Sequence, residues 1–149
     1  MMQSRSHSYP LVTDADYLSL LTRKLFHSGF NKALVDKKWP DFHDAFAGFE
    51  PAVVGAFGTM DICRLQEDAR IVRHRKKIRA TIHHARHFCE MAELHGTWRS
   101  WFHGLRSQTY ARRESTLKSS FEYCGPNTIF YFLYEAGEVD LTHRPPAVR

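Results

Sequence analysis

The sequence predicts an all-α domain, and three observations lead to that class. Apolar residues recur at the three- and four-residue spacing of a helix along most of the chain. No convincing run of alternating apolar and polar residues, which would mark a strand, is found. Glycine, proline and capping residues divide the chain at short intervals. With 149 residues, 43% of them hydrophobic, we assign residues 1–149 to one domain, with loose tails at 1–12 and 141–149.

The first half of the chain predicts several short helices. Thr13 and Asp14 are typical capping residues and open a first helix, which Gly29 interrupts. Further helices are expected at about 31–38, at 41–46 after Pro40, as a turn within 49–58, and from Thr59 onward. Pro40 separates two of them, because the residue before a proline disfavours the helical conformation.

A long basic helix is expected after Asp68 and before Gly96. Residues 70–88 hold seven Arg or Lys, four His and no acid, so the positive charge of the chain is concentrated there. Helical spacing places a buried stripe at Ile71, Ile78, Ile82, Ala85 and Cys89, with Arg75 beside it and facing inward. The opposite face would carry Arg73, Lys76, Lys77, His83, His84 and His87. Such a one-sign face is either a phosphate-contacting surface or simply a solvated one.

The last third of the chain predicts two helices joined by a tight turn, after a partly helical aromatic segment at 97–105. The helices are expected at 114–121 and 128–137, with the turn YCGPN at 123–127 between them. Backbone N–H groups at a turn that leads into a helix form an anion site suited to a DNA phosphate. This is a helix-hairpin-helix layout, although an ordinary connection between two helices has the same spacing.

Composition restricts the remaining possibilities. Cys63, Cys89 and Cys124 are scattered and form no CxxC, so neither a disulfide framework nor a thiolate zinc site is indicated. This use of cysteine predicts a cytoplasmic protein, and no apolar run has the length of a membrane span. His83 and His87 have a spacing that can bind a metal, but no third ligand is evident, so we expect no metal or cofactor. A pI of 9.3 favours an anionic partner.

Three segments resemble the 3-methyladenine DNA glycosylase I family of the helix-hairpin-helix superfamily. DARIVRHRKKIRATIHHARHF (68–88) is similar to that family's Asp, two residues, Ile-Ile/Val-Arg-Asn-Arg-x-Lys-Ile pattern. KKWPDFHDAFAGFEPAVVGAF (37–57) resembles its Lys-Lys/Arg-x-x-x-Phe/Tyr, Ala-Phe and Phe-Asp-Pro stretch, and FEYCGPNTIFYFLYEAG (121–137) resembles its hairpin. The resemblance implies a glycosylase-like helical domain that excises alkylated purines such as 3-methyladenine from double-stranded DNA.

The segment expected to carry the chemistry departs from that family. LTRKLFHSGFNKAL (21–34) aligns with a catalytic segment similar to Leu-Glu-Gly-x-Gln-Ala-Gly-Leu-Ser-Trp. Lys24 then stands on the glutamate that contacts the extruded base, and Lys32 stands on the pocket tryptophan. The family's zinc ligands are also missing, since no early Cys exists and His143 is followed by Arg-Pro-Pro. The chain therefore resembles a diverged branch without the glutamate and the zinc site.

The catalytic residue stays open at this level. Cleavage of the glycosidic bond passes through a cation-like sugar, which a carboxylate or the DNA phosphates can stabilise. Asp140, placed after the hairpin helix as in the wider superfamily, is one candidate carboxylate, although a charge at a helix end explains it equally. Lys24 is a second candidate, as a Schiff-base nucleophile, beside a plainer role as a surface or phosphate-contacting lysine.

Binding residues follow from the same resemblance and from the hairpin. Lys24, Phe26 and Phe30 are predicted to line the base pocket, although aromatic residues at helical spacing also suit a core. The predicted DNA-binding residues are Tyr123, Gly125, Asn127, Thr128, Arg73, Lys76 and Lys77. We expect a monomer that binds damaged duplex DNA and no membrane. The alternatives are a helix-hairpin-helix module that binds DNA without chemistry, and a basic helical protein that binds no DNA.

Overall fold

The computed structural model describes residues 10–146, and in this range the chain forms α-helices, three short 3-10 helices and no strand. The elements are α1 Asp14–His27, α2 Lys32–Lys37, α3 Trp39–Ala45, η1 Ala47–Phe49, α4 Pro51–Val54, α5 Thr59–Gln66, α6 Arg75–His95, α7 Trp98–Gly104, η2 Leu105–Ser107, α8 Tyr110–Ser120, α9 Pro126–Glu135 and η3 Leu141–His143. The all-α class predicted from the sequence is confirmed. None of the helices in the described range is both long and apolar enough to cross a membrane.

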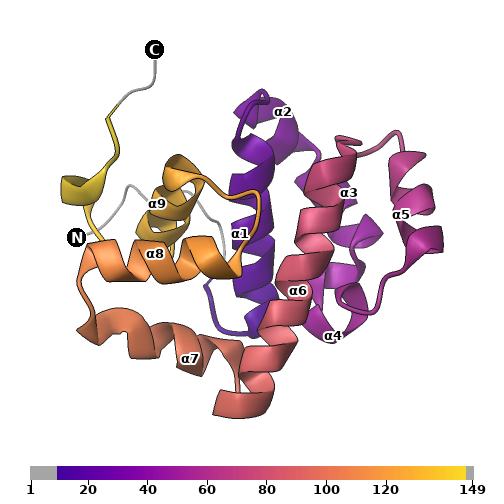
Figure 1. Ribbon diagram of the computed structural model, residues 1–149. Coiled ribbons are helices and arrows are strands. Elements are labelled where there is room, and N and C mark those ends of the chain that lie inside the picture. The colour runs from indigo at the N-terminus through magenta and orange to yellow at the C-terminus, as the bar shows by residue number, and fades with distance from the viewer. Residues whose placement is uncertain (1–9, 147–149) are drawn as a thin grey trace.

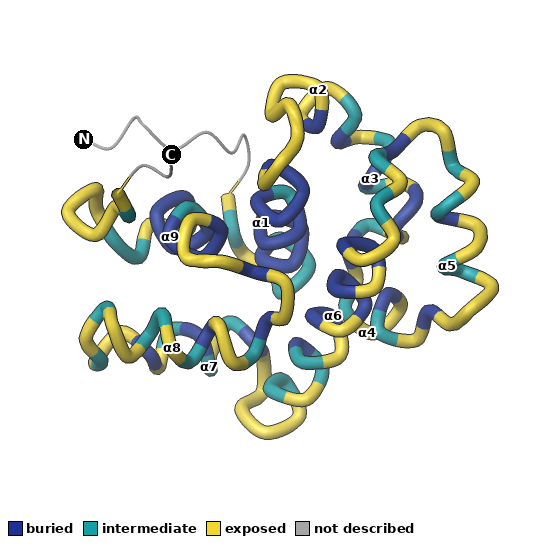
Figure 2. The backbone as a smooth tube through the Cα atoms, turned by 45° about the horizontal axis from the view of Figure 1, so that its top comes forward, coloured by how far each residue is buried: buried dark blue, intermediate teal, exposed yellow. Residues whose placement is uncertain are grey.

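Two helices, α1 and α6, form the centre of the molecule (Figure 1). The short helices α2 to α5 lie on one side of this centre, and α7 to α9 lie on the other. α1 contacts α6, α9, α2 and α4, so it joins the two sides. Figure 2 shows that most of α1 is buried, whereas α5 is largely exposed.

The first helix begins where the sequence predicts. The Thr13 side chain accepts a hydrogen bond from the Asp16 backbone N–H at 3.2 Å, and the Asp16 carboxylate accepts one from the Thr13 N–H at 2.9 Å. This reciprocal arrangement satisfies N–H groups that the helix start leaves open. Because α1 is buried on nearly all sides, its polar residues Thr22 and Lys24 must find partners inside the protein.

Stacked aromatic rings fill both halves of the core. On the α2–α5 side, Trp39 stacks on Phe42 and Phe49, with ring centroids 4.7 and 5.4 Å apart. On the other side, Trp98 stacks on Phe88 at 4.0 Å, joining α7 to α6. Aromatic pairs of this kind stabilise beyond the area that they bury. Both stacks belong to one apolar core, to which α1 and α6 also contribute.

The basic helix differs from its prediction in start and orientation. It begins at Arg75, with the His74 side chain as its cap, and not directly after Asp68. Ile71 is buried but lies before the helix, so it cannot define the helix's inner face. Arg75, predicted to face inward, is exposed and donates to Gln66 Oε1 at 2.9 Å.

Two residues predicted on the exposed face of α6 are buried. Lys77 and His84 point inward, because α6 contacts α1 as well as α4 and α7 and therefore buries a broader arc than one apolar stripe. Arg73, Lys76 and His83 are exposed, as expected. The charged face of α6 is thus real but narrower than the sequence pattern indicates.

The helix-hairpin-helix layout is present in α8, the following turn and α9. α9 begins at Pro126 with Gly125 as its cap, and α8 begins at Tyr110, earlier than predicted. Tyr123, in the turn, has a φ of 67°, a left-handed conformation that is uncommon outside glycine. His84 Nε2 lies 2.9 Å from the Glu122 carbonyl oxygen, so α6 holds the turn from beneath.

The chain ends are only partly described. Residues 1–9 and 147–149 lie outside the described range, so the loose tails and the single-domain assignment stay predictions. Leu141–His143 forms the short turn η3. His143 stacks on Tyr110 with ring centroids 4.5 Å apart, which attaches the start of the C-terminal segment to α8.

Candidate functional site

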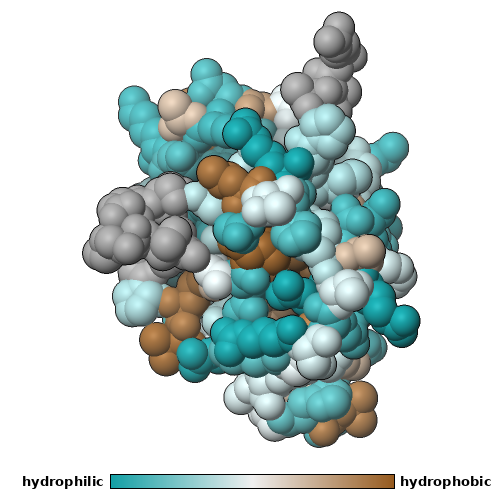
Figure 3. Space-filling view, turned by 90° about the vertical axis from the view of Figure 1, so that its left-hand side faces the viewer, coloured by the Kyte–Doolittle hydropathy of each residue, from teal (hydrophilic) through white to brown (hydrophobic). Residues whose placement is uncertain are grey.

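A cleft of about 680 Å³ opens where the C-terminal end of α1 meets α2 and α9. Its size falls within the range of about 300–1,000 Å³ that is typical of small-molecule sites. The lining residues are Lys24, His27, Ser28 and Gly29 from α1 and its following turn, Lys32 and Asp36 from α2, Asn127, Thr128, Tyr131 and Glu135 from α9, and Arg144, Pro145 and Pro146. The face of the molecule that carries α8 and α9 is mostly hydrophilic, with small separate apolar patches (Figure 3).

A buried ion pair joins the two central walls of this cleft. Lys24 Nζ of α1 lies 3.2 Å from Glu135 Oε2 of α9, and the two side chains are 8% and 9% exposed. Burial lowers the pKa of Lys24 below its ordinary value, while the adjacent Glu135 opposes that shift. The cleft therefore presents an amine and a carboxylate side by side, largely shielded from water.

A second polar cluster lies one helical turn further along α1. His27 Nε2 is 2.7 Å from Asp36 Oδ1, and Arg23 Nε donates to the same oxygen at 2.8 Å. Burial lowers the pKa of His27, although the hydrogen bond with Asp36 opposes this. Burial raises the pKa of Asp36, but His27 and Arg23 outweigh it and leave that pKa below its ordinary value. This carboxylate is thus already committed to two partners, and it attaches α2 to α1.

Lys77 holds the turn that forms the cleft's edge. Its Nζ donates to the Leu25 carbonyl at 2.8 Å and also to the Ser28 carbonyl, both at the C-terminal end of α1. A cation at a helix C-terminus interacts favourably with the free carbonyl groups there. Lys77, predicted to be an exposed DNA-binding residue, is instead buried and holds the Ser28–Gly29 turn.

Three aromatic rings form an exposed ridge beside the hairpin. The His74 ring lies 5.8 Å from the Phe30 ring and 5.9 Å from the Tyr123 ring. Phe30 is 37% exposed and Tyr123 is 50% exposed. We call Phe30, His74 and Tyr123 the aromatic ridge; it joins the turn after α1, the start of α6 and the hairpin.

Of the predicted pocket residues, only Lys24 lines the cleft. Phe26 is fully buried and packs against Phe42, with ring centroids 4.9 Å apart, so it belongs to the core. Phe30 belongs to the aromatic ridge and does not line the cleft. The apolar spacing of α1 does not distinguish these environments, because every side of this helix meets a neighbour.

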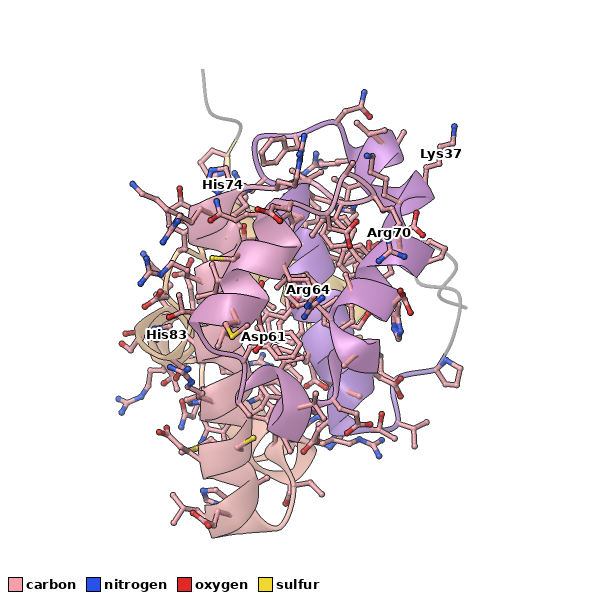
Figure 4. All side chains as sticks on the ribbon, turned by 90° about the vertical axis from the view of Figure 1, so that its right-hand side faces the viewer. Lys37, Asp61, Arg64, Arg70, His74 and His83 are labelled. Atoms are coloured by element: carbon pink, nitrogen blue, oxygen red, sulfur yellow. The ribbon has the colours of Figure 1, made fainter. Side chains whose placement is uncertain are left out.

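The predicted DNA-binding residues divide into three places. Asn127 and Thr128 line the cleft at the start of α9. Gly125 and Tyr123 are exposed in the hairpin turn. Arg73 and Lys76 are exposed around the start of α6, and His83, lower on that helix, has its Nδ1 3.7 Å from Glu122 Oε1 of the hairpin turn (Figure 4). Lys77, the remaining predicted DNA-binding residue, is buried instead.

Asp140 does not belong to the cleft. It is exposed, and its Oδ1 accepts a hydrogen bond from the Thr142 N–H at 2.9 Å, which caps η3. The same hydrogen bond lowers the pKa of Asp140. The helix-end role considered for this residue therefore agrees with its placement, and the catalytic role does not.

The described residues do not fit a zinc site of the kind that the resemblance implies. In residues 10–146, no group of three or more His, Cys, Asp or Glu side chains could hold a metal ion. Arg106 instead forms two hydrogen bonds with the Glu138 carboxylate at 2.9 and 2.7 Å. Together with the His143–Tyr110 stack, this ion pair attaches the segment after α9 to its neighbours.

Sequence reasoning missed Glu135 and the His27–Asp36 contact. A signal for Glu135 was available, since it is the single acid in the otherwise apolar run 128–137. A charged residue in a buried helix indicates a partner of opposite charge. Nothing in the sequence pairs it with Lys24, because that contact depends on how α9 lies against α1.

Comparison with known proteins supports one family. The methyladenine glycosylase family matches residues 6–119. DNA-3-methyladenine glycosylase 1 of Escherichia coli (strain K12) is 38% identical over 66 residues, which are 44% of this chain and 35% of the relative. The curated relative is thus matched over about a third of its length.

Solved structures share the fold over nearly the whole chain. The structure of 3-methyladenine DNA glycosylase I from Staphylococcus aureus, described as the basis of 3-methyladenine recognition, has a TM-score of 0.78 and 24% identity, and the alignment covers 94% of this chain and 87% of that one. A single-residue variant of a 3-methyladenine DNA glycosylase I, in complex with 3-methyladenine, gives a TM-score of 0.77 at 25% identity, with 93% and 87% covered. Because the family match extends over well more than half of the sequence, the chain belongs to the methyladenine glycosylase family.

Proposed function

We propose that the protein is a DNA glycosylase of base-excision repair, which hydrolyses the N-glycosidic bond of an alkylated purine such as 3-methyladenine. The observation that carries this proposal is the cleft between α1 and α9 beside the hairpin, in a chain of the methyladenine glycosylase family. The cleft supplies buried charge where an extruded base would enter. The aromatic ridge and the hairpin supply the groups that would meet the duplex.

Each part of the surface has a physical role in this proposal. The N–H groups at the start of α9 would bind a phosphate, because they are not used within the helix. Arg73 and Lys76 would add charge to the same duplex face. Phe30 and Tyr123 would stack against bases that the extrusion exposes.

Base release from methylated duplex DNA tests the proposal directly. The protein is incubated with DNA treated with a methylating agent, and free 3-methyladenine is separated by liquid chromatography. Release above that of a heat-inactivated control supports the enzyme. Release no greater than the control, from protein shown to be folded by circular dichroism, would contradict it.

The alternative is a DNA-binding module without chemistry, and Lys24 at the position of the family's glutamate favours it. The salt dependence of duplex binding separates DNA binding from catalysis. If about four to six phosphates are contacted, log K should fall with log salt at about −0.9 per phosphate. Binding with this slope but without base release would support the DNA-binding module. Binding without any salt dependence would contradict both the glycosylase and the module.

Location and assembly follow from the proposal and are tested separately. We propose a cytoplasmic protein that acts as a monomer on damaged duplex DNA. Sedimentation at micromolar concentration should give a mass near 17.4 kDa for the free chain. Localisation of a fluorescent fusion within cells tests the compartment.

A further inference from the structure

A buried carboxylate lines the cleft, although the family's glutamate is absent from α1. Glu135 lies in the last turn of α9, is 7% exposed and lines the cleft beside Lys24. The resemblance implies a carboxylate on α1; here an amine stands at that position, and a carboxylate faces it from α9.

The other nearby carboxylates are more exposed or lie outside the cleft. Asp36 lines the cleft, but one oxygen is bound by both His27 and Arg23, and its side chain is 42% exposed. Asp140 lies outside the cleft and caps η3. Glu138 is directed toward Arg106 of η2. Among the described residues, Glu135 is therefore the carboxylate that combines burial with a place in the cleft wall.

A structural role alone explains the pair poorly. Bringing two charges out of water is costly, and buried pairs replaced by apolar residues are often as stable or more stable. α1 and α9 lie against each other and bring apolar residues such as Leu25 and Ile129 into the core, so an apolar pair would suit their contact as well. A charged pair placed where these two helices line a cleft fits a ligand that needs both charges.

We propose that Glu135 is the carboxylate that contacts the extruded base, and that Lys24 is its positioning partner. This inference rests on the proposed function. The Glu135 oxygens would accept hydrogen bonds from N–H groups of the base, and the Lys24 amine would donate to a neighbouring ring nitrogen. A base that carries a donor and an acceptor side by side, as adenine does with N6 and N7, matches this pair.

The pair also removes an electrostatic conflict. An N-alkylated purine carries positive charge while it is still attached to the sugar, so a lone ammonium in the pocket would repel it. With Glu135 at 3.2 Å, the charge of Lys24 is compensated, and the cleft no longer opposes a cationic base. The carboxylate can then favour the cationic state from which the base leaves.

The test uses Glu135→Gln, which keeps the size of the side chain and removes its charge. We expect release of 3-methyladenine from methylated duplex DNA to fall about 100-fold. Affinity for the free base 3-methyladenine, measured by calorimetry, should fall about tenfold or more, as for a lost hydrogen bond to a charged group. Base binding is a readout that a purely structural pair would not change in folded protein.

Glu138→Gln is the matched control, because Glu138 has a buried carboxylate that lies three residues later and outside the cleft. It should lower the thermal midpoint without weakening base binding at a temperature where the protein is folded. If Glu135→Gln behaves like this control, with wild-type release and binding, the proposal is overturned.

Exchange of the two charges tests Lys24. Glu135→Lys alone places two amines together and should abolish base release. The double variant Lys24→Glu with Glu135→Lys restores a pair of opposite charges, and its rate of base release should be at least tenfold higher than that of Glu135→Lys. A double variant no better than the single one would contradict the positioning role. A wild-type protein that neither releases nor binds 3-methyladenine would instead contradict the proposed function, so the two failures are distinguishable.

Discussion

Two sets of charged contacts of similar length lie on opposite sides of the molecule. In the cleft, Lys24 and Glu135 approach to 3.2 Å and are almost fully buried. On the other side, Arg70 lies 2.9 Å from Asp68 and 3.0 Å from Asp44, but its side chain is 46% exposed (Figure 4). The contact distance therefore does not determine how much each interaction contributes to stability, whereas its exposure to water does. Water screens the charges of the Arg70 cluster, whereas the buried Lys24–Glu135 pair is screened much less.

The largest expected effect is that of Lys24→Met. The substitution keeps the length of the side chain but leaves the Glu135 carboxylate buried without its amine. Loss of one partner of a buried pair destabilises by about 3–5 kcal/mol. Urea denaturation followed by circular dichroism should show this as a lower midpoint with an unchanged slope. A loss below about 1 kcal/mol would mean that the pair is hydrated and resembles the Arg70 cluster.

The second effect is acid destabilisation through His84, a buried group beneath the hairpin. Burial lowers the pKa of His84 from 6.5 to about 4, since the ring is enclosed and its Nε2 lies against the Glu122 carbonyl. Between pH 4 and pH 6.5 the unfolded chain binds a proton that the folded protein does not. The contribution of neutral His84 to the free energy of unfolding is therefore fully present above pH 6.5 and is lost as the pH falls toward 4. This loss corresponds to about 3 kcal/mol.

His84→Gln provides the control for that pH dependence. Glutamine can donate to the same carbonyl and does not titrate, so the variant's free energy of unfolding should decline less between pH 6.5 and pH 4. Parallel curves for the two proteins would assign the acid sensitivity to other groups. Hydrogen exchange at the Tyr123–Gly125 amides should report whether the hairpin opens first.

The sequence predicts well what depends on neighbouring residues. Thr13 caps α1 and Gly96 ends α6 as expected, because capping needs only the chemistry of a few consecutive residues. The hairpin before α9 follows from Gly125 and Pro126 in the same way.

The sequence does not predict what depends on how helices meet. Lys77 is a typical exposed lysine by pattern, yet α6 directs it toward the free carbonyls of α1. The Lys24–Glu135 pair joins residues far apart in the chain, so no local pattern contains it. The catalytic residue therefore stays open at the level of the sequence, and the role of Lys24 in a base pocket stays a prediction.

Lys77→Met should have a moderate effect, between those of the cleft pair and the surface cluster. It removes the hydrogen bonds to Leu25 and Ser28, which we expect to lower stability at pH 7 by about 2 kcal/mol. Base release should also fall, because the Ser28–Gly29 turn lines the cleft. Denaturant titration measures the loss of stability, and the base-release assay measures the loss of activity. If neither stability nor base release falls, the turn does not depend on Lys77.

The pH dependence of Lys77 has a defined direction. Burial lowers its pKa from 10.5 to about 8. Between pH 8 and pH 10.5 the unfolded chain binds a proton that the folded protein has released, so the free energy of unfolding rises with pH. The contribution of the neutral Lys77 amine is fully present above pH 10.5 and is lost as the pH falls through 8. The difference in unfolding free energy between wild type and Lys77→Met should therefore widen from pH 8 toward pH 10. A constant difference would contradict a buried, titrating Lys77.

The smallest expected effect is that of Arg70→Ala, although three acidic side chains surround Arg70. Its hydrogen bonds to Asp68 and Asp44 raise the pKa of Arg70, and Asp41 lies within 3.8 Å, yet the group is exposed. At 0.15 M salt, charges at such a surface are screened within about 8 Å, and ordering the long side chain offsets the attraction that remains. We therefore expect the urea midpoint of Arg70→Ala to equal that of wild type at this salt, and to be slightly lower at about 0.01 M. A loss as large as that of Lys24→Met would show that burial does not separate the two clusters, because the acids around the exposed Arg70 would then stabilise the protein as much as Glu135 does through Lys24.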